Sequence, residues 1–225
     1  MAAPTVVFDL DGTLVDTAPD LVDTLNVVFA RAGLPPVPFA TARNMIGGGA
    51  RAMIERSLKA EGRPLIAAEI DTLFGHFIDH YTAHIADRSR PFPGLQAALE
   101  RLAARGCPLA ICTNKVEALS LQLLAALDLA KHFAAICGPD TLGTQKPDPE
   151  MLRQTIVRAG GRPDCAVMVG DSATDIDTAR AAGIPIVAVE FGYTEIPVAE
   201  LGPDKIIGHF DELPGAIFDL VAWRH

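Results

Sequence analysis

The sequence predicts an α/β protein with a doubly wound, mostly parallel sheet, a Rossmann-like core, into which a helical cap domain is inserted. Two observations support this fold class. Short apolar, β-branched runs recur along the chain and, from residue 109 onward, alternate with segments of helical periodicity. No comparable run lies between residues 8 and 109, an interval far longer than an ordinary crossover connection.

The expected strands are apolar at nearly every position, which is typical of parallel strands buried on both faces. They lie at residues 5–8, 109–112, 134–137, 166–169 and 186–189, with a weaker sixth at 205–207. Helical periodicity covers residues 116–127, 150–159 and 175–182, each close to a turn, Gly or Pro signal. Because strand and helix alternate in this part of the chain, we expect the strands to pair in parallel.

The long interval after the first strand has the pattern of a separate helical unit. Pro19 stands at the start of a helical pattern that continues to Ala32, and further helical periodicity covers residues 50–60 and 65–86. A segment with two prolines, residues 88–94, returns the chain to the core. We therefore expect a cap domain at residues 16–88 and an α/β core at residues 1–15 and 89–225.

Composition limits the classes of partner. The 225-residue chain has a formal net charge of -9 and no cluster of Lys and Arg, so a nucleic-acid partner is not expected. No stretch approaches the roughly 20 apolar residues of a membrane span, and no signal segment opens the chain, so we expect no membrane partner and a cytoplasmic location. A small anion remains a suitable ligand, because a metal ion, a lysine and backbone N–H groups can make one pocket positive.

Polar side chains follow the expected strands at the carboxyl ends, the edge where such sheets bind ligands. They are Asp9 and Asp11 after the first strand, Thr113 and Asn114 after the second, Lys146 before a later helix, and Asp171, Ser172 and Asp175 after the fourth. Two carboxylates two residues apart repel each other at neutral pH unless a cation lies between them or one is protonated. Mg²⁺ prefers such oxygens, and we expect Asp9, Asp171 and the Asp11 backbone carbonyl to bind it, with Asp175 holding a coordinating water or orienting a ligand.

This arrangement favours phosphoryl transfer. Asp9 is the candidate nucleophile, because a carboxylate that attacks phosphorus divides one difficult hydrolysis into two easier steps. Asp11 is the candidate general acid and base for the leaving group and the later water. Lys146, the Thr113 hydroxyl and the Asn114 region are expected to hold the charged phosphoryl oxygens.

The same residues resemble the four motifs of the haloacid dehalogenase-like hydrolases, in order and in their placement after strands. The resemblance covers nearly the whole chain. It is carried by two aspartates followed by Gly, Thr and Leu, by Thr113 and Lys146, and by the run from Gly170 to Asp175. The dehalogenases of the family lack the second aspartate, so Asp11 implies the phosphatase or phosphomutase branch, whose helical cap the insertion also resembles.

Within that branch the chain is similar to phosphoglycolate phosphatases. The similar segments are residues 46–51 with Arg56, Ser57 and Leu58, and the run from Phe191 to Tyr193. The resemblance implies a small anionic phosphomonoester as substrate, with 2-phosphoglycolate the first expectation. Gly47, Gly48 and Gly49 would let backbone approach the ligand, and Arg51 could meet its carboxylate bidentately.

Other interpretations of these residues stay open. Gly47, Gly48 and Gly49 also suit a flexible turn between helices, Arg51 a solvated helix position, and Ser172 and Asp175 a helix cap. Lys115 could replace Lys146 beside the phosphoryl group. His76, His80 and His84 would share one helical face and could bind a transition metal.

Two other functions also stay open. A sugar phosphomutase, similar to β-phosphoglucomutase, shares all four motifs, and a catalytically silent binding protein could use the same fold. The sequence is compatible with a monomer or a homodimer. For an enzyme we expect the cap to open and close about residues 15–17 and 88–93.

Overall fold

The apolar runs form a six-stranded sheet in which every strand pairing is parallel, in a computed structural model that describes residues 3–194 and 196–222. The strand order is β5-β4-β1-β6-β7-β8. The strands are β1 (Thr5–Phe8), β4 (Leu109–Cys112), β5 (Ala135–Cys137), β6 (Ala166–Gly170), β7 (Ile186–Val189) and β8 (Lys205–Ile207). The predicted α/β class with a mostly parallel sheet is confirmed.

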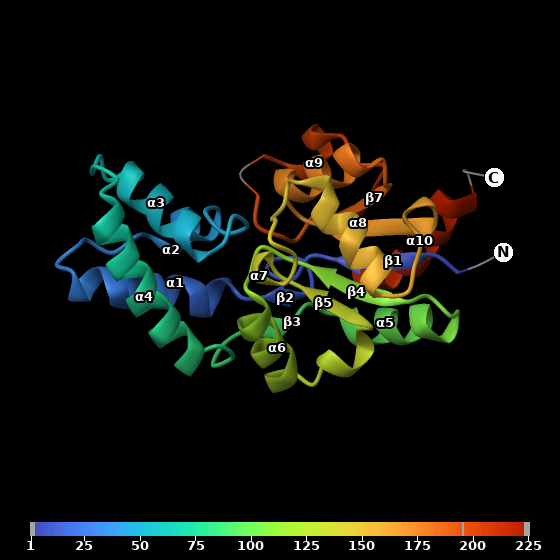
Figure 1. Ribbon diagram of the computed structural model, residues 1–225, viewed down its shortest axis with the longest axis horizontal. Coiled ribbons are helices and arrows are strands. Elements are labelled where there is room, and N and C mark those ends of the chain that lie inside the picture. Colours follow the sequence, from blue (N-terminus) through green and yellow to red (C-terminus); the bar gives the residue numbers. More distant parts are fainter. Residues whose placement is uncertain (1–2, 195, 223–225) are drawn as a thin grey trace.

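Helices cover both faces of the sheet (Figure 1), because the side chains of each strand alternate between the two faces. In β1, Val6 and Phe8 belong to one apolar cluster and Val7 to the other. The first cluster includes residues of α5 (Leu95–Ala104), α6 (Glu117–Ala126) and α10 (Leu213–Ala222), and the second includes residues of α8 (Pro149–Arg158) and α9 (Ala173–Ala182). Burial on both faces explains why the strands are apolar throughout.

Local chemistry fixes where the helices near the sheet's carboxyl edge begin. Asp148 caps α8 by accepting a hydrogen bond from the Glu150 N–H, with Pro149 as the first helical residue. Ser172 and Asp175 form a reciprocal capping box at the start of α9. Contacts within the protein therefore hold the Asp175 side chain near the end of β6.

The inserted helices form a lobe beside the sheet (Figure 1). They are α1 (Ala18–Arg31), α2 (Phe39–Arg43), α3 (Ala50–Ala60) and α4 (Ala67–Ala83). Phe29 of α1 and Phe77 and Tyr81 of α4 are among the largest fully buried side chains, so the lobe packs around aromatic groups of its own.

Two short strands connect this lobe to the core. β2 (Val15–Asp16) and β3 (Arg90–Pro91) pair antiparallel. The buried Asp20 carboxylate accepts hydrogen bonds from the Arg88 N–H and from the Ser89 N–H and hydroxyl. The outgoing and returning segments are thus tied together, at the residues where the sequence predicts the hinge.

Several elements lie where the sequence analysis predicts none: β2, α2, β3, α5, α7 (Pro139–Leu142) and α10. The predicted core range also includes residues 1–2, 195 and 223–225, which lie outside the described residues. Within the described part of the chain, no helix is both long enough and apolar enough to cross a bilayer.

Candidate active site

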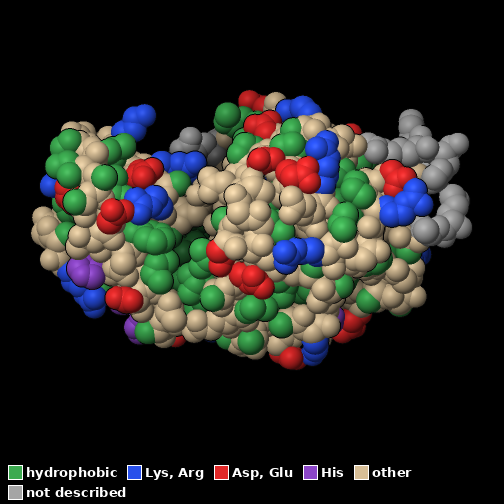
Figure 2. Space-filling view, in the orientation of Figure 1, with side chains coloured by type: hydrophobic (Ala, Val, Ile, Leu, Met, Phe, Trp, Pro, Cys, Tyr) green, Lys and Arg blue, Asp and Glu red, His purple; other side chains and the backbone are tan. Residues whose placement is uncertain are grey.

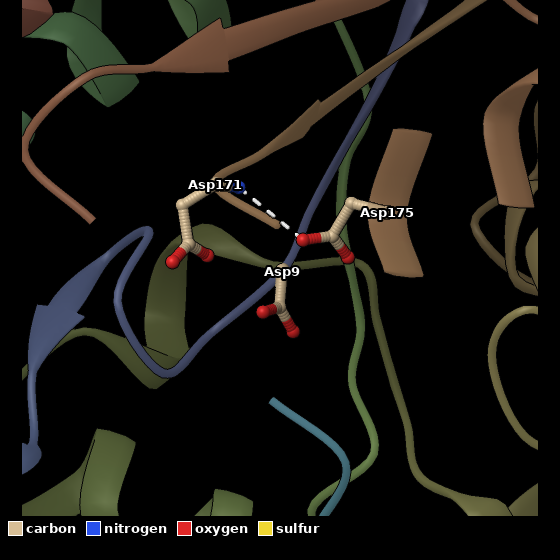
Figure 3. A group of neighbouring side chains, drawn as sticks. All are labelled: Asp9, Asp171 and Asp175. Atoms are coloured by element: carbon tan, nitrogen blue, oxygen red, sulfur yellow. Dashed lines mark hydrogen bonds between the residues drawn. The ribbon is translucent and has the colours of Figure 1, made fainter. Parts of the chain in front are cut away.

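Three carboxylates meet where β1 and β6 end side by side. Asp9 follows β1, Asp171 follows β6, and Asp175 belongs to the first turn of α9. One oxygen from each lies within 4.8 Å of the others, and all three residues are buried. Figure 3 shows the side chains gathered at this point, with the Asp171 N–H donating to Asp175 Oδ2 at 3.2 Å. Since the chain turns away in opposite directions after these adjacent strands, the position is the one where open α/β sheets bind ligands.

The environment of these carboxylates disfavours their negative charge. Burial raises the pKa of Asp9, and the neighbouring Lys146 ammonium offsets only part of that rise. Burial also raises the pKa of Asp171, helped by the negative charges of Asp175 and Asp9. A cation would relieve both effects, and carboxylate oxygens are donors suited to a hard divalent cation. The acidic group can therefore bind a metal.

Neighbouring groups hold the Asp171 carboxylate in place. Thr13 Oγ1 donates to Oδ1 at 2.8 Å, and the Tyr193 N–H donates to Oδ2 at 2.6 Å. Gly12 has a φ of 85°, and a Cβ added there would lie 2.6 Å from Asp171 Oδ2. The glycine after Asp11 is thus required both by the turn and by the close approach of Asp171.

Lys146 is the cation beside the candidate nucleophile. Its Nζ lies 2.7 Å from Asp9 Oδ1 and 2.6 Å from Asp175 Oδ1, with all three side chains buried. Burial alone would lower the pKa of Lys146, but the carboxylates of Asp175 and Asp9 outweigh it and raise the pKa above its ordinary value. Lys146, rather than Lys115, therefore holds the position next to Asp9.

Asn114 positions Lys146 through backbone contacts. Its Oδ1 accepts from the Lys146 N–H at 2.9 Å, and its Nδ2 donates to the Lys146 carbonyl at 3.1 Å. The same Nδ2 donates to the Gly47 carbonyl at 3.3 Å. The amide group thus links the loop that carries Lys146 to the glycine segment of the cap.

The second aspartate is held by a different cation. Lys115 Nζ lies 2.9 Å from both Asp11 carboxylate oxygens, and 4.7 Å from the centre of the Tyr81 ring in the cap. Burial alone would lower the pKa of Lys115, but Asp11 outweighs it and raises the pKa above its ordinary value. The Asp11 side chain is therefore paired outside the acidic group.

A cavity of about 210 Å³ lies between the cap and these residues. Asp9, Asp11, Thr113 and Lys115 line its core side, and its cap side is mostly apolar. In Figure 2 the surface is hollowed between the two lobes, and hydrophobic side chains gather there. The space is large enough for a small ester placed with its phosphoryl group at Asp9.

The glycine segment closes one side of this cavity. Gly47, Gly48 and Gly49 all line it, and Gly49 has a φ of 87°. A Cβ on Gly49 would lie 3.2 Å from the Asn114 carbonyl oxygen, so the cap backbone approaches the core closely here. The segment is thus a contact between cap and core as well as the start of α3.

Two other groups of predicted residues make their printed contacts outside the acidic group. Arg51 lines the cavity, but its side chain is 46% exposed, is paired with Asp71, and packs over the Phe74 ring. Of the three histidines, His80 and His84 stack at 4.4 Å and contact other side chains. Among the described residues, the group close enough to share a metal is the three-aspartate group, which contains no histidine.

Sequence reasoning missed the partners that position the site. Thr13 and Tyr193 hold Asp171, Lys115 holds Asp11, and Tyr81 lies over Lys115. The Lys115–Asp11 pair spans 104 residues of sequence, and no local motif encodes a pairing at such a distance. Three signals were available: Thr13 and Tyr193 lie in segments that carry the family resemblance, and Lys115 follows Thr113 and Asn114 at the end of a strand.

Comparisons with known proteins agree on one family. The model of the haloacid dehalogenase-like hydrolases matches residues 6–189. A phosphoglycolate phosphatase from Mesorhizobium japonicum is 55% identical over 213 residues, covering 95% of this chain and 94% of that protein. A phosphoglycolate phosphatase from Caulobacter vibrioides is 48% identical, covering 96% of this chain and 92% of that protein.

The fold is also similar to solved structures. A predicted phosphoglycolate phosphatase from Haemophilus somnus superposes with a TM-score of 0.87 at 29% identity, over 94% of this chain and 96% of that chain. A protein described in the same terms from Lactobacillus delbrueckii subsp. bulgaricus gives a TM-score of 0.89 at 26% identity, over 96% of this chain and 99% of that chain.

Proposed function

Because the chain belongs to the haloacid dehalogenase-like hydrolases, we propose that it is a phosphatase that hydrolyses 2-phosphoglycolate through an aspartyl-phosphate on Asp9. The observation that carries this proposal is the position of Asp9. It follows the carboxyl end of β1, its Oδ1 lies 2.7 Å from Lys146 Nζ, and it belongs to the buried acidic group. The high identity to phosphoglycolate phosphatases over nearly the whole chain supports the choice of substrate.

In the first step, an Asp9 carboxylate oxygen attacks phosphorus and the bond from phosphorus to the ester oxygen breaks. The ester oxygen takes the bonding electron pair and receives a proton from the Asp11 carboxyl group, so glycolate leaves. Lys146 and the Thr113 hydroxyl bind phosphoryl oxygens, whose charge grows in the transition state. Asn114 acts by holding the Lys146 backbone, since its amide is already engaged there.

In the second step, Asp11 acts as the base. It takes a proton from a water molecule, whose oxygen attacks the phosphorus of the aspartyl-phosphate and releases inorganic phosphate and the Asp9 carboxylate. This step requires Asp11 to change roles between steps, from acid to base. Lys115, which contacts both Asp11 oxygens, keeps that carboxyl group in a fixed position for both.

We propose Mg²⁺ as the metal, held by the carboxylates of Asp9 and Asp171 and by the Asp11 backbone carbonyl. When bound, it supplies positive charge that offsets the negative charge of the carboxylates and of the substrate phosphate. Asp175 contributes indirectly in this proposal, because its two oxygens are already engaged by Lys146 and by the capping box with Ser172.

The helical lobe acts, in this proposal, as a cap domain of residues 16–88 on a core of residues 1–15 and 89–225. It opens about residues 15–17 and 88–93 to admit a small phosphomonoester and closes to exclude bulk water. Gly47, Gly48 and Gly49 form one part of the cap that meets the core, through Asn114. We further propose a cytoplasmic enzyme that acts as a monomer or homodimer.

The test is phosphate release from a panel of small phosphomonoesters, with and without Mg²⁺, by the wild type and by Asp9→Asn. The proposal expects metal-dependent turnover, greatest with 2-phosphoglycolate, that is lost in the variant. Absence of turnover on every ester would exclude a phosphatase. Isomerisation of a sugar phosphate in the presence of its bisphosphate would instead favour the phosphomutase, which no described contact favours at present.

A further inference from the structure

Lys115 lies beside Asp11 on the cavity wall, close to where the leaving group of the substrate would be placed. For Asp11 to protonate the ester oxygen, that oxygen has to lie within hydrogen-bonding distance of the Asp11 carboxyl group. Lys115 Nζ lies 2.9 Å from both oxygens of that carboxyl group and lines the same cavity. A charged group one or two bonds beyond the ester oxygen is therefore brought close to this ammonium.

The ammonium has donor capacity left. It carries three N–H donors, and the Asp11 oxygens take two of them. The face of Lys115 not turned to Asp11 lies against the Tyr81 ring. A carboxylate that entered here would meet a cation inside a buried site, where its attraction is much stronger than in water.

Tyr81 supplies an independent sign that an acceptor belongs in this place. Its side chain is buried and lines the cavity, and its hydroxyl lies near the Lys115 ammonium but has no hydrogen-bond acceptor among the described residues. A buried O–H without an acceptor costs stability, so such groups usually serve a bound ligand or water. Burial raises the pKa of Tyr81 to about 12, although Lys115 nearby lowers it, so the hydroxyl keeps its proton.

Arg51, which also lines the cavity, is less suited than Lys115 to bind a carboxylate of the substrate. Arg51 is 46% exposed and already paired with Asp71 on the cap surface. Other cap residues on the wall include Leu21, Met53 and Phe77, which offer no charge to a carboxylate. The contacts thus favour Lys115 over the arginine that the sequence analysis selects.

We propose that Lys115 and Tyr81 form the subsite for the substrate's carboxylate, the group that the enzyme does not transfer. The inference rests on the proposed function, since it places the second anion of a phosphorylated hydroxy acid. The ammonium donates to one carboxylate oxygen and the phenol O–H to the other. Because Asp11 shares the ammonium, an ester without a carboxylate leaves Lys115 bound to Asp11 alone.

The test compares two esters, 2-phosphoglycolate and ethyl phosphate, which share the phosphate and differ in the carboxylate. The measured quantity is the ratio of their kcat/KM values in the Mg²⁺-loaded enzyme. Lys115→Met should lower this ratio by about 10- to 100-fold, the range for a charge-assisted hydrogen bond. Tyr81→Phe, which keeps the ring, should lower it by roughly 3- to 10-fold through a higher KM for 2-phosphoglycolate. Arg51→Gln is the matched comparison and should leave the ratio unchanged.

The outcomes separate the subsite from the proposed function. If the wild type prefers 2-phosphoglycolate but Lys115→Met slows both esters equally, Lys115 only positions Asp11 and the subsite is wrong. A lowered ratio in Arg51→Gln, with none in Tyr81→Phe, would assign the carboxylate to Arg51. If the wild type hydrolyses ethyl phosphate and 2-phosphoglycolate with equal kcat/KM, the proposed substrate is wrong. The subsite, which depends on that substrate, is then wrong too. Should Lys115→Met not fold, Tyr81→Phe decides the question alone.

Discussion

The Tyr193 hydroxyl donates a 2.5 Å hydrogen bond to Asp16 Oδ1, and so joins a loop of the core to the first strand that leads into the cap. The Tyr193 hydroxyl oxygen accepts from the Ala18 N–H at 2.9 Å, and the Tyr193 N–H donates to Asp171. One residue therefore contacts the acidic group through its backbone and the predicted hinge through its side chain. Tyr193 thus links the predicted hinge to the position of Asp171.

Tyr193→Phe is expected to destabilise the protein. The change removes the hydroxyl and leaves Asp16 Oδ1 and the Ala18 N–H without this partner, at a cost of about 1–3 kcal/mol in the free energy of unfolding. Urea unfolding measures the loss. Tyr81→Phe is the matched control, because that O–H has no hydrogen-bond acceptor to lose among the described residues. Equal losses in the two variants would contradict the assigned role of the Tyr193 hydroxyl.

Lys146→Met should abolish activity and destabilise the fold together. The variant leaves the buried Asp9 and Asp175 carboxylates without their shared cation, and breaking a buried ion pair typically costs about 3–5 kcal/mol. Thermal unfolding of the metal-free protein checks this. The control is Lys131→Met, which breaks an exposed pair with Asp128 and should leave both the unfolding temperature and the activity unchanged. A stable, inactive Lys146→Met would show that the pair does not hold the site together.

The metal-free protein should lose stability as the pH rises through neutrality. The folded-state pKa of Asp9 is raised to about 7 and that of Asp171 to about 8, above the ordinary value of 3.8. At pH values between the ordinary pKa of 3.8 and these raised pKa values, the folded state binds more protons than the unfolded state. The stability contributed by these groups is therefore full below about pH 4 and lost by about pH 8. The measurement is the unfolding temperature of the wild type minus that of Asp171→Asn, from about pH 5 to 9.

Mg²⁺ should reverse this loss, since it binds the deprotonated carboxylates and competes with protons for them. The rise in unfolding temperature on adding Mg²⁺ is expected to be larger at about pH 8 than at about pH 6. Asp171→Asn, which removes one proposed ligand, should show little rise at either pH. A pH-independent rise in the wild type would mean that the metal binds elsewhere.

Arg43 of α2 should control cap closure. Its guanidinium donates to the carbonyls of Phe191 and Gly192, at 3.1 and 2.8 Å, and lies 4.7 Å from the centre of the Tyr193 ring. Arg43→Gln weakens this cap-to-core contact, so KM and kcat for 2-phosphoglycolate should both change, with kcat/KM lower by about 10-fold. Steady-state kinetics measure the effect. The control is Arg31→Gln, at an exposed position at the end of α1, which should behave like the wild type.

The sheet was predictable because its strands are buried on both faces and are therefore apolar without interruption, as in residues 5–8 and 166–169. The carboxylates of the candidate site could be placed because parallel strands end at a common edge. The resemblance to the haloacid dehalogenase-like hydrolases, made on those residues, is confirmed by the family model. By contrast, β2 and β3 are two residues long, and no periodicity can be read over so short a stretch.

The contacts that position the site could not be predicted in the same way. Tyr193 meets Asp16 across 177 residues, and Asp20 fixes the returning linker across 68 or more, so only the folded chain brings them together. For Arg51, the sequence pattern predicts a contact other than the one that the structure contains. Its sequence context suggested a ligand contact, but side-chain direction on α3 turns it toward Asp71. The role assigned to it from the sequence stays a prediction that the ester comparison tests.

We expect the phosphoryl group to pass through a covalent bond to Asp9. Rapid mixing of the Mg²⁺-loaded enzyme with 2-phosphoglycolate, followed by acid quenching and peptide mass spectrometry, tests it directly. A phosphoryl group should form on the peptide that contains Asp9 before inorganic phosphate is released, and it should be missing in Asp9→Asn. Turnover without any phosphoenzyme, or a phosphoryl group that persists in Asp9→Asn, would contradict it.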